Sequence, residues 1–291
     1  MTKRVPYIVG DIHGCFDELI ALEKMIKEHS AANRWLPLLV SVGDLIDRGQ
    51  NSNQVINRFQ EGQIRGTHSC ILGNHEADFL RLIEAFNPTL LPKLNPAIFS
   101  IKEDFLQKRR GAEFYTNEEE FQQASLVSWL EQGGFETLAS YQIKSHDPST
   151  WNLPVDAISF LNNLPIIWAN NDYVVTHALA SSAQLKAALS GPLLQKSDDF
   201  LFKESCFALM WNRNHPENHP DPHRVHLSGH SPLAEVFASK KFKFIQIDTG
   251  CVYGGELTAF CCANQELLAA PMQNKAFSRH PHTLVKKKPD L

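Results

Sequence analysis

The stretch Gly43-Asp44-Leu45-Ile46-Asp47-Arg48-Gly49 places two carboxylates, one guanidinium and two glycines within seven residues. It follows Leu38–Val42, an apolar and partly β-branched run that predicts a buried strand. Carboxylates at a strand end, on a turn that glycine permits, suit a hard divalent cation or a phosphoryl group. The arginine beside them suits phosphate oxygens, which a guanidinium binds through paired N–H donors. Taken alone, the stretch is also compatible with a solvated turn rich in Asp and Gly.

Two further stretches have the same form, in which an apolar run ends in glycine and a metal-competent residue follows. Gly10-Asp11-Ile12-His13-Gly14 follows Val5–Val9, and Gly73-Asn74-His75-Glu76 follows Ser69–Leu72. Asp, His and Asn supply the oxygen and imidazole donors that suit borderline and hard transition metals. Because the apolar runs alternate with helical patterns, parallel strands should bring all three turns to one edge of a sheet.

These stretches read GDxHG, GDxxDRG and GNHE, in this order. They resemble the motifs of the calcineurin-like metallophosphoesterase superfamily, and in particular of its phosphoprotein phosphatase branch. The resemblance covers about Val5 to Leu268 and implies an α/β fold, a four-layer αββα sandwich with two central mixed β-sheets flanked by helices. We expect one domain over residues 1–270, with a helical insertion at 88–132, and a flexible basic tail at 271–291.

The resemblance implies six metal ligands, each at the end of a predicted strand: Asp11, His13, Asp44, Asn74, His177 and His230. The first two would hold one ion, the last three would hold a second ion, and the carboxylate of Asp44 would bridge them. Two ions held in this way can activate a shared water for attack on phosphorus. We expect Mn²⁺, and Fe, Zn²⁺ and Ni²⁺ are the alternatives because they accept the same donors.

The chain contains 13 histidines, and a lone histidine is most often an ordinary surface or core residue. His177 and His230 differ because each directly follows an apolar run that predicts a strand. His215, His219 and His223 have a helical spacing, but the prolines among them exclude a regular helix. We therefore expect the last three to lie in a loop near the site without binding metal.

The resemblance also implies four catalytic residues: His75, Asp47, Arg48 and Arg213. His75 would donate a proton to the leaving alkoxide, and Asp47 would orient its ring. Arg48 would bind phosphoryl oxygens through both of its terminal nitrogens. The second arginine is assigned from Leu209–Arg213, which resembles the LWxR stretch of the family, and Arg224 is the alternative.

Two other stretches receive structural interpretations. Gly133–Tyr141 resembles a GGxxTLxSY stretch of many bacterial members of this branch, and we expect it to be structural. Lys108-Arg109-Arg110 is expected to be a solvated helix face, with a lid over an acidic substrate as the alternative.

Three functional hypotheses follow from these residues. The leading one is a metal-dependent phosphomonoesterase, namely a serine/threonine protein phosphatase that can also accept phosphotyrosine. The alternative is a symmetrical bis(5'-nucleosyl)-tetraphosphatase, a branch that tends to carry Ala in place of Asp47 and Asp in place of Glu76. Neither change is present, although Gly14–Leu19 resembles the GCYDEL stretch of that branch. An inactive binding module is disfavoured because all ligands and phosphate-binding residues are intact.

Composition limits the partners. The chain has 291 residues, of which 43% are hydrophobic and 21% charged, so it can bury a full core. A net charge of −4 gives no preference for polyanions, and we expect no nucleic-acid partner. No run approaches the roughly 18 apolar residues of a membrane span, and no signal-peptide core follows Met1. Six scattered cysteines without a CxxC motif indicate reduced thiols and a cytoplasmic location. The expected partners are phosphorylated proteins or small phosphate esters.

Overall fold

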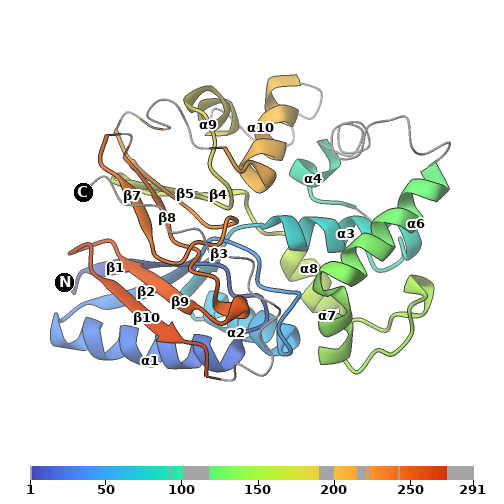
Figure 1. The fold of residues 1–291 in the computed structure, drawn as a ribbon, viewed down its shortest axis with the longest axis horizontal. Coiled ribbons are helices and arrows are strands. Elements are labelled where there is room, and N and C mark those ends of the chain that lie inside the picture. The colour runs from blue at the N-terminus through green and yellow to red at the C-terminus, as the bar shows by residue number, and fades with distance from the viewer. Residues whose placement is uncertain are drawn as a thin grey trace.

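The computed structural model describes residues 2–91, 93–100, 118–189, 200–214, 221, 223–241 and 243–273. At the centre of this part of the chain, two mixed β-sheets lie face to face, with helices outside them (Figure 1). The sequence predictions for 102–110, His215, His219 and 274–291 fall outside the described residues.

The first sheet has the strand order β10-β9-β1-β2-β3. Strands β1 (Arg4–Val9), β2 (Leu36–Ser41) and β3 (His68–Cys70) are parallel. Strands β9 (Glu256–Cys261) and β10 (Leu267–Pro271) extend the sheet in antiparallel fashion beside β1. Since the three parallel strands run in one direction, the motif turns after them meet at one edge of the sheet.

The second sheet has the order β4-β5-β6-β8-β7. Its parallel centre consists of β5 (Tyr173–Thr176), β6 (Val225–Ser228) and β8 (Phe244–Gln246). The antiparallel edges are β4 (Ile167–Ala169) and β7 (Phe237–Ser239). Strands β4 and β5 form the hairpin predicted from the sequence, and the strand ends that carry His177 and His230 belong to this sheet.

Helices cover the outer faces. In the first sheet, α1 (Phe16–Ala32) packs on β2, β9 and β10, and α2 (Ser52–Ile64) packs on β3. Beside the second sheet, α9 (Ser182–Leu189) packs against α10 (Phe200–Trp211) (Figure 1). The predicted fold of two mixed sheets between helices is therefore confirmed.

A second group of helices lies at the ends of the sheets (Figure 1). It contains α3 (Asn74–Phe86), α4 (Pro96–Ser100), α6 (Glu118–Trp129), α7 (Phe135–Ser140) and α8 (Val155–Asn162). Helix α6 packs on α3, and α7 packs on α2. Within residues 88–132, α4 and α6 are helical whereas the described residues before α4 are not, and α6 lies against the helix that begins at Asn74. The short helical turns of the described chain are Leu130–Gly134, Pro148–Thr150 and Cys251–Tyr253.

The layer between the sheets is apolar and dry. Its buried side chains come from both sheets and include Ile8, Val40, Val42, Ile71, Tyr173, Val175, Leu227, Ile247 and Phe260. Burial of one such side chain stabilises the fold by about 1.5–3 kcal/mol. This packing fixes the two sheets relative to each other, and with them the loops that carry the predicted ligands.

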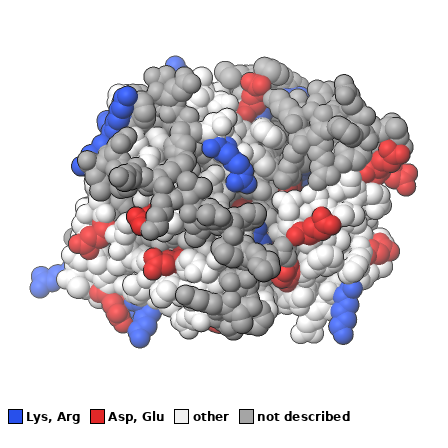
Figure 2. Space-filling model, viewed as in Figure 1, with Lys and Arg blue, Asp and Glu red and all other residues white. Residues whose placement is uncertain are grey.

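The surface of the described residues shows no segregation of charge on the face in Figure 2, where basic and acidic side chains are interspersed. None of the helices in the described part of the chain has the length and apolar character needed to cross a bilayer.

Candidate active site

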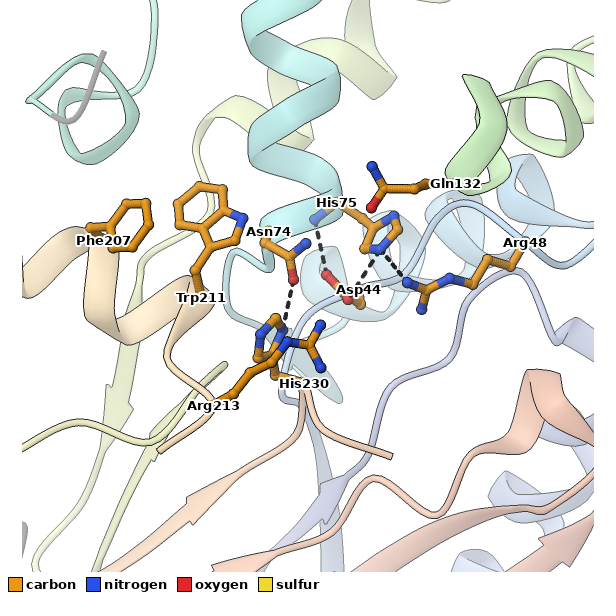
Figure 3. A pocket seen from close by; sticks show the side chains of 9 residues that line it. All are labelled: Asp44, Arg48, Asn74, His75, Gln132, Phe207, Trp211, Arg213 and His230. Carbon is orange, nitrogen blue, oxygen red and sulfur yellow. Dashed lines mark hydrogen bonds and ion pairs between the residues drawn. The ribbon is translucent and has the colours of Figure 1, made fainter. Parts of the chain in front are cut away.

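The loops after β1, β2, β3, β5 and β6 converge at one edge of the two sheets. They bring together all six predicted metal ligands, whose side chains are between 0 and 6% exposed. A cavity of about 280 Å³ opens beside them. Figure 3 shows the residues that line it: Asp44, Arg48, Asn74, His75, Gln132, Phe207, Trp211, Arg213 and His230.

One set of donor atoms lies between the two sheets. The Asn74 Oδ1 atom is 2.9 Å from both His177 Nε2 and His230 Nδ1, and these two ring nitrogens are 3.1 Å apart. The Asp44 Oδ2 atom is 3.4 Å from His177 Nε2. The buried Nε2 atom of His230 has no hydrogen-bond partner among the described residues. One oxygen, two imidazoles and a carboxylate at these separations could hold one divalent ion.

A second set lies on the other side of Asp44, whose Oδ2 atom is also 3.4 Å from His13 Nε2. The Nε2 atom of His75 is 3.9 Å from the same oxygen, and these three residues form a group that could hold an ion. The carboxylate of Asp11, the other ligand expected here, accepts hydrogen bonds of 3.1 and 3.2 Å from the backbone N–H of His230. Asp44 therefore lies between the two sets, as expected of a bridging ligand.

Backbone carbonyls fix which ring nitrogen each histidine presents. The Nδ1 atom of His13 donates to the carbonyl of Ile46 at 2.8 Å, and that of His177 donates to the carbonyl of Val42 at 2.9 Å. Each Nε2 atom is thereby left unprotonated, which is the usual outer-shell arrangement for metal-binding histidine, although the Nε2 atom of His13 contacts Arg48 in this structure.

The electrostatics of the cluster favour cations. Burial raises the pKa of Asp44 to about 7, and burial together with Asp248 and Asp44 raises the pKa of Asp11. Burial lowers the pKa of His177 to about 4, so its imidazole is neutral. The charge of Arg48 lowers the pKa of both carboxyls but does not offset their burial. Crowded carboxyls of raised pKa beside neutral imidazoles fit two divalent metal ions.

Asp248 is a member of this cluster that the sequence analysis did not assign. Its buried carboxyl shares a hydrogen bond with Asp11, and it accepts the backbone N–H of Gly250 at 2.9 Å. The signal in the sequence is the apolar strand that ends at Ile247, because the aspartate then occupies the same kind of strand-end position as the ligands.

Asp47 orients the ring of His75. The Nδ1 atom of His75 donates to Asp47 Oδ2 at 2.7 Å, and the Nε2 atom faces the cavity (Figure 3). Asp47 is fully buried and also accepts hydrogen bonds from Trp129 Nε1 at 2.9 Å and Thr137 Oγ1 at 2.6 Å. Burial and the nearby Arg48 lower the pKa of His75. The imidazole is therefore held in one orientation by a carboxylate that is itself fixed from two other directions.

Arg48 presents its guanidinium to the same cavity. One terminal nitrogen contacts His13 Nε2, and the other donates to His75 Nε2 at 2.7 Å (Figure 3). The guanidinium also lies 5.5 Å from the ring centre of Tyr253, in the position of a cation–π contact. A planar fork in this place can bind two phosphoryl oxygens.

The stretch Gly133–Tyr141, for which we expected a structural role, contacts two of the predicted catalytic residues. Thr137 binds the carboxylate of Asp47, and the carbonyl of Gly133 accepts the backbone N–H of Arg48 at 3.2 Å. Gly133 has φ +121°, and a Cβ there would lie 2.2 Å from the Arg48 nitrogen, so no other residue fits. The stretch therefore holds the GDxxDRG turn in place.

Glu76 binds the same turn from the side of α3. Its carboxylate accepts the backbone N–H groups of Gly73, Asp44, Leu45 and Ile46 at 3.0, 2.9, 2.7 and 3.2 Å. The sequence analysis did not assign this role. A partial signal was present, since a glutamate at the third position of a helix commonly reaches back to the residue that caps it.

The backbone is in the left-handed region at five site residues that are not glycine. These are His13, Asp44, Asp47, Arg48 and His230, with φ of 44°, 50°, 70°, 69° and 68°. Such conformations are uncommon for residues with a Cβ and concentrate at functional sites. Their presence in three separate loops supports the assignment of the site.

The remaining wall of the cavity is formed by α10 and the residues after it. The rings of Phe207 and Trp211 are stacked, with centroids 5.2 Å apart and planes inclined by 20°. Arg213 follows the helix and lines the cavity with them. Arg224, the alternative arginine, is paired with Asp221 at 2.7 Å and does not line this cavity.

Comparison with known proteins bears on this geometry. The sequence pattern of the calcineurin-like phosphoesterases matches residues 7–266. The chain belongs to the calcineurin-like phosphoesterase family. A Bacillus velezensis member, the asymmetrical bis(5'-nucleosyl)-tetraphosphatase PrpE, is 25% identical over 269 residues, which are 87% of each chain. A Klebsiella pneumoniae member, a symmetrical bis(5'-nucleosyl)-tetraphosphatase, is 24% identical over 288 residues, covering 91% of this chain and 94% of its own.

Among solved structures, this calcineurin-like phosphoesterase is similar to the cold-active protein-tyrosine phosphatase of a psychrophilic Shewanella species. The TM-score is 0.50 with 17% sequence identity, over 93% of this chain and 80% of the other. The likeness shows a common fold. Family membership makes the protein a metallophosphoesterase, and the two donor sets around Asp44 fit the dinuclear metal centre of the family.

Proposed function

We propose that this metallophosphoesterase hydrolyses phosphate monoesters, and that phosphoserine and phosphothreonine in proteins are its substrates. The observation that carries the proposal is the pair of His75 and Asp47, held at 2.7 Å, with the other ring nitrogen of His75 facing the cavity, where it accepts a hydrogen bond from Arg48. A serine or threonine alkoxide is a poor leaving group and needs a proton as the P–O bond breaks. An imidazole in this position is suited to supply it.

In this proposal, the metal ligands and the arginines have separate roles. Asp11, His13 and Asp44 hold one divalent ion, and Asp44 holds the second together with Asn74, His177 and His230. The two ions, for which we propose Mn²⁺, supply an activated water and draw negative charge from the phosphoryl group. Arg48 and Arg213 bind the phosphoryl oxygens from two sides, which orients phosphorus and stabilises charge that develops on it.

Without substrate, burial and the charge of Arg48 lower the pKa of His75 and favour its neutral ring, so the proposal requires substrate binding to change these surroundings. Its ring donates Nδ1–H to Asp47, so a proton on Nε2 makes it a cation whose charge Asp47 balances. Substrate oxygens that engage Arg48 would remove the guanidinium contact from His75 Nε2 and leave this nitrogen to face the leaving oxygen.

All six cysteines are free in the structure, which supports the cytoplasmic location inferred from the sequence.

A symmetrical bis(5'-nucleosyl)-tetraphosphatase is the second candidate. Two observations favour it, namely the name of the Klebsiella pneumoniae relative and the stacked rings of Phe207 and Trp211 beside the cavity. An aromatic surface next to a phosphoryl site could contact a nucleobase. A pyrophosphate leaving group is stable without protonation, however. With this substrate, His75 and Asp47 would have no catalytic role as a proton donor and its partner.

A direct assay separates the candidates. Purified protein loaded with Mn²⁺ is given phosphoserine, phosphothreonine and phosphotyrosine peptides and, in parallel, diadenosine tetraphosphate, with Asp44→Asn protein as the control for contaminating phosphatases. A higher kcat/KM for phosphoserine or phosphothreonine peptides supports the proposal. Preferential conversion of the dinucleotide to ADP alone would replace it with the second candidate. Turnover of none of these substrates would refute both.

A further inference from the structure

A second cluster of metal-competent side chains lies outside the active site. It consists of Cys15, Glu18 and Cys251, which are distant in sequence but have their two sulfur atoms and one carboxylate oxygen all within 4.8 Å of one another. All three side chains are buried. The proposed hydrolysis uses none of them.

We propose that Cys15, Glu18 and Cys251 form a separate zinc site, with two thiolates and one carboxylate as protein ligands. Zn²⁺ accepts sulfur and oxygen donors in tetrahedral geometry, and three protein ligands with one open position is a common arrangement. The active site offers imidazole, amide and carboxylate donors without sulfur, so the two kinds of site would differ in metal preference. The inference does not depend on which phosphate ester the enzyme hydrolyses.

The two sulfur atoms lie within 4.8 Å of each other, close enough for one ion to bind both. Cys15 occupies the cap position of α1, and Glu18 lies in the first turn of the same helix. Backbone N–H groups at a helix N-terminus favour negative charge, which two thiolates and a carboxylate bring when they bind a cation.

The carboxylate and the space beside it complete the argument. One oxygen of Glu18 accepts the backbone N–H of Gln273 at 2.9 Å, which orients the carboxylate as outer-shell partners do for metal ligands. A cavity of about 80 Å³ is lined by Cys15 and Glu18, together with Val252 and Met272. This volume exceeds the ~10–15 Å³ that one water needs, so a water can enter as the fourth ligand.

The position of the cluster gives the zinc a structural consequence. Cys15 comes two residues after His13, and its thiol donates to the His13 carbonyl at 3.7 Å. Cys251 comes three residues after Asp248, in the turn between β8 and β9. A zinc ion would therefore join the loop that carries one active-site ligand to the loop that carries the carboxyl partner of Asp11. We expect bound zinc to raise the unfolding temperature.

The test uses cobalt as a spectroscopic substitute for zinc, in deoxygenated buffer with a phosphine reductant. Full-length protein is titrated with Co²⁺, and the near-ultraviolet charge-transfer band that only thiolate ligation produces is recorded. We expect this band in the wild type and its displacement by Zn²⁺. Cys15→Ser and Cys251→Ser should each lose the band, and Glu18→Gln should weaken cobalt binding. In protein whose active site is loaded with Mn²⁺, zinc content should fall from one ion per chain to none in each cysteine variant.

Cys262→Ser is the matched control, because Cys262 directly follows β9, outside the cluster, and its loss should leave the band unchanged. Circular dichroism of each variant shows whether it is folded. If a serine variant is not folded, Glu18→Gln still tests the site, because it retains both thiols. Absence of the band in wild-type protein, or its persistence in both cysteine variants, would overturn the proposal. A wild type that does not bind cobalt through sulfur, and whose intact mass is two hydrogens too low until reductant restores it, would also overturn the proposal. That outcome identifies a disulfide pair.

Discussion

The active-site cavity has two walls of different origin. One wall is made by loops that follow β-strands of both sheets, and its ligands are almost fully buried. The other is made by helical segments, namely the turn at Gln132 and the end of α10 with Phe207, Trp211 and Arg213. On this wall the side chains are partly or fully exposed.

The two walls differ in how firmly the fold holds them, and this difference suggests different roles in the reaction and in the choice of substrate. Strand ends are fixed by the packing between two sheets, so the donors around Asp44 can be placed to within the tolerance that metal ions require. Helical segments at the sheet edge can vary without disturbing that packing. We infer that the strand-end wall determines that a phosphoryl group is attacked, and that the helical wall determines which substrate carries it.

The largest effect is expected at the centre of the strand-end wall. Asp44→Asn should abolish hydrolysis and weaken the binding of both ions, because this carboxylate lies 3.4 Å from one histidine of each donor set. Elemental analysis and phosphopeptide turnover measure the two effects. Full metal content together with a rate near that of the wild type would show that the donor sets are assigned wrongly.

His75→Asn comes next, and its effect should depend on the leaving group. A general acid contributes about 10²–10⁴-fold, so most activity on a phosphoserine peptide should be lost. The loss should be noticeably smaller on p-nitrophenyl phosphate, whose nitrophenolate leaves without a proton. Asp47→Asn should show the same bias in milder form. Equal losses on both substrates, with metal content retained, would remove His75 from the role of acid.

Arg213→Ala tests whether the helical wall contributes to catalysis. We expect a reduction in kcat of about 10²–10³-fold with metal content unchanged, because loss of one donor to a developing oxyanion has effects of this size. Arg48→Ala should behave in the same way. Arg224→Ala is the matched control, since Arg224 is paired with Asp221. An unchanged rate for Arg213→Ala beside a disabled Arg224→Ala would transfer the role to Arg224.

Thr137→Val should have the smallest effect. The substitution keeps the shape of the side chain but removes the 2.6 Å hydrogen bond to Asp47, a contact behind the catalytic pair. Loss of an outer-shell partner typically reduces activity about 10–100-fold, and we expect the lower end on phosphoserine peptides with little change on p-nitrophenyl phosphate. Ser140→Ala controls for general damage to α7. A uniform loss on both substrates would make Thr137 a purely structural residue.

The strand-end wall could be predicted from the sequence because its information is local. Each motif begins where an apolar run ends, and the common hand of the crossovers through α1 and α2 then brings the turns together. The first sheet, its helices and the hairpin of β4 and β5 were accessible for the same reason. Strand and helix patterns therefore defined most of the fold.

The supports of the site were not predictable in this way. Trp129 and Thr137 reach Asp47 across 82 and 90 positions of the chain, and nothing in their local sequence identifies that partner. The change from α6 to the turn Leu130–Gly134 also depends on tertiary structure, because the Gly133 carbonyl accepts the backbone N–H of Arg48. The left-handed backbone at His13 is likewise imposed by the surrounding fold.

The left-handed residues have a consequence for the evolution and engineering of this enzyme. A residue with a Cβ in that conformation lowers the stability of a fold by about 1–2 kcal/mol, with aspartate least affected. We therefore expect glycine in place of His13, Arg48 or His230 to raise the unfolding temperature of the protein and at the same time to make it inactive. Selection for heat resistance alone would therefore erase the site at these positions first.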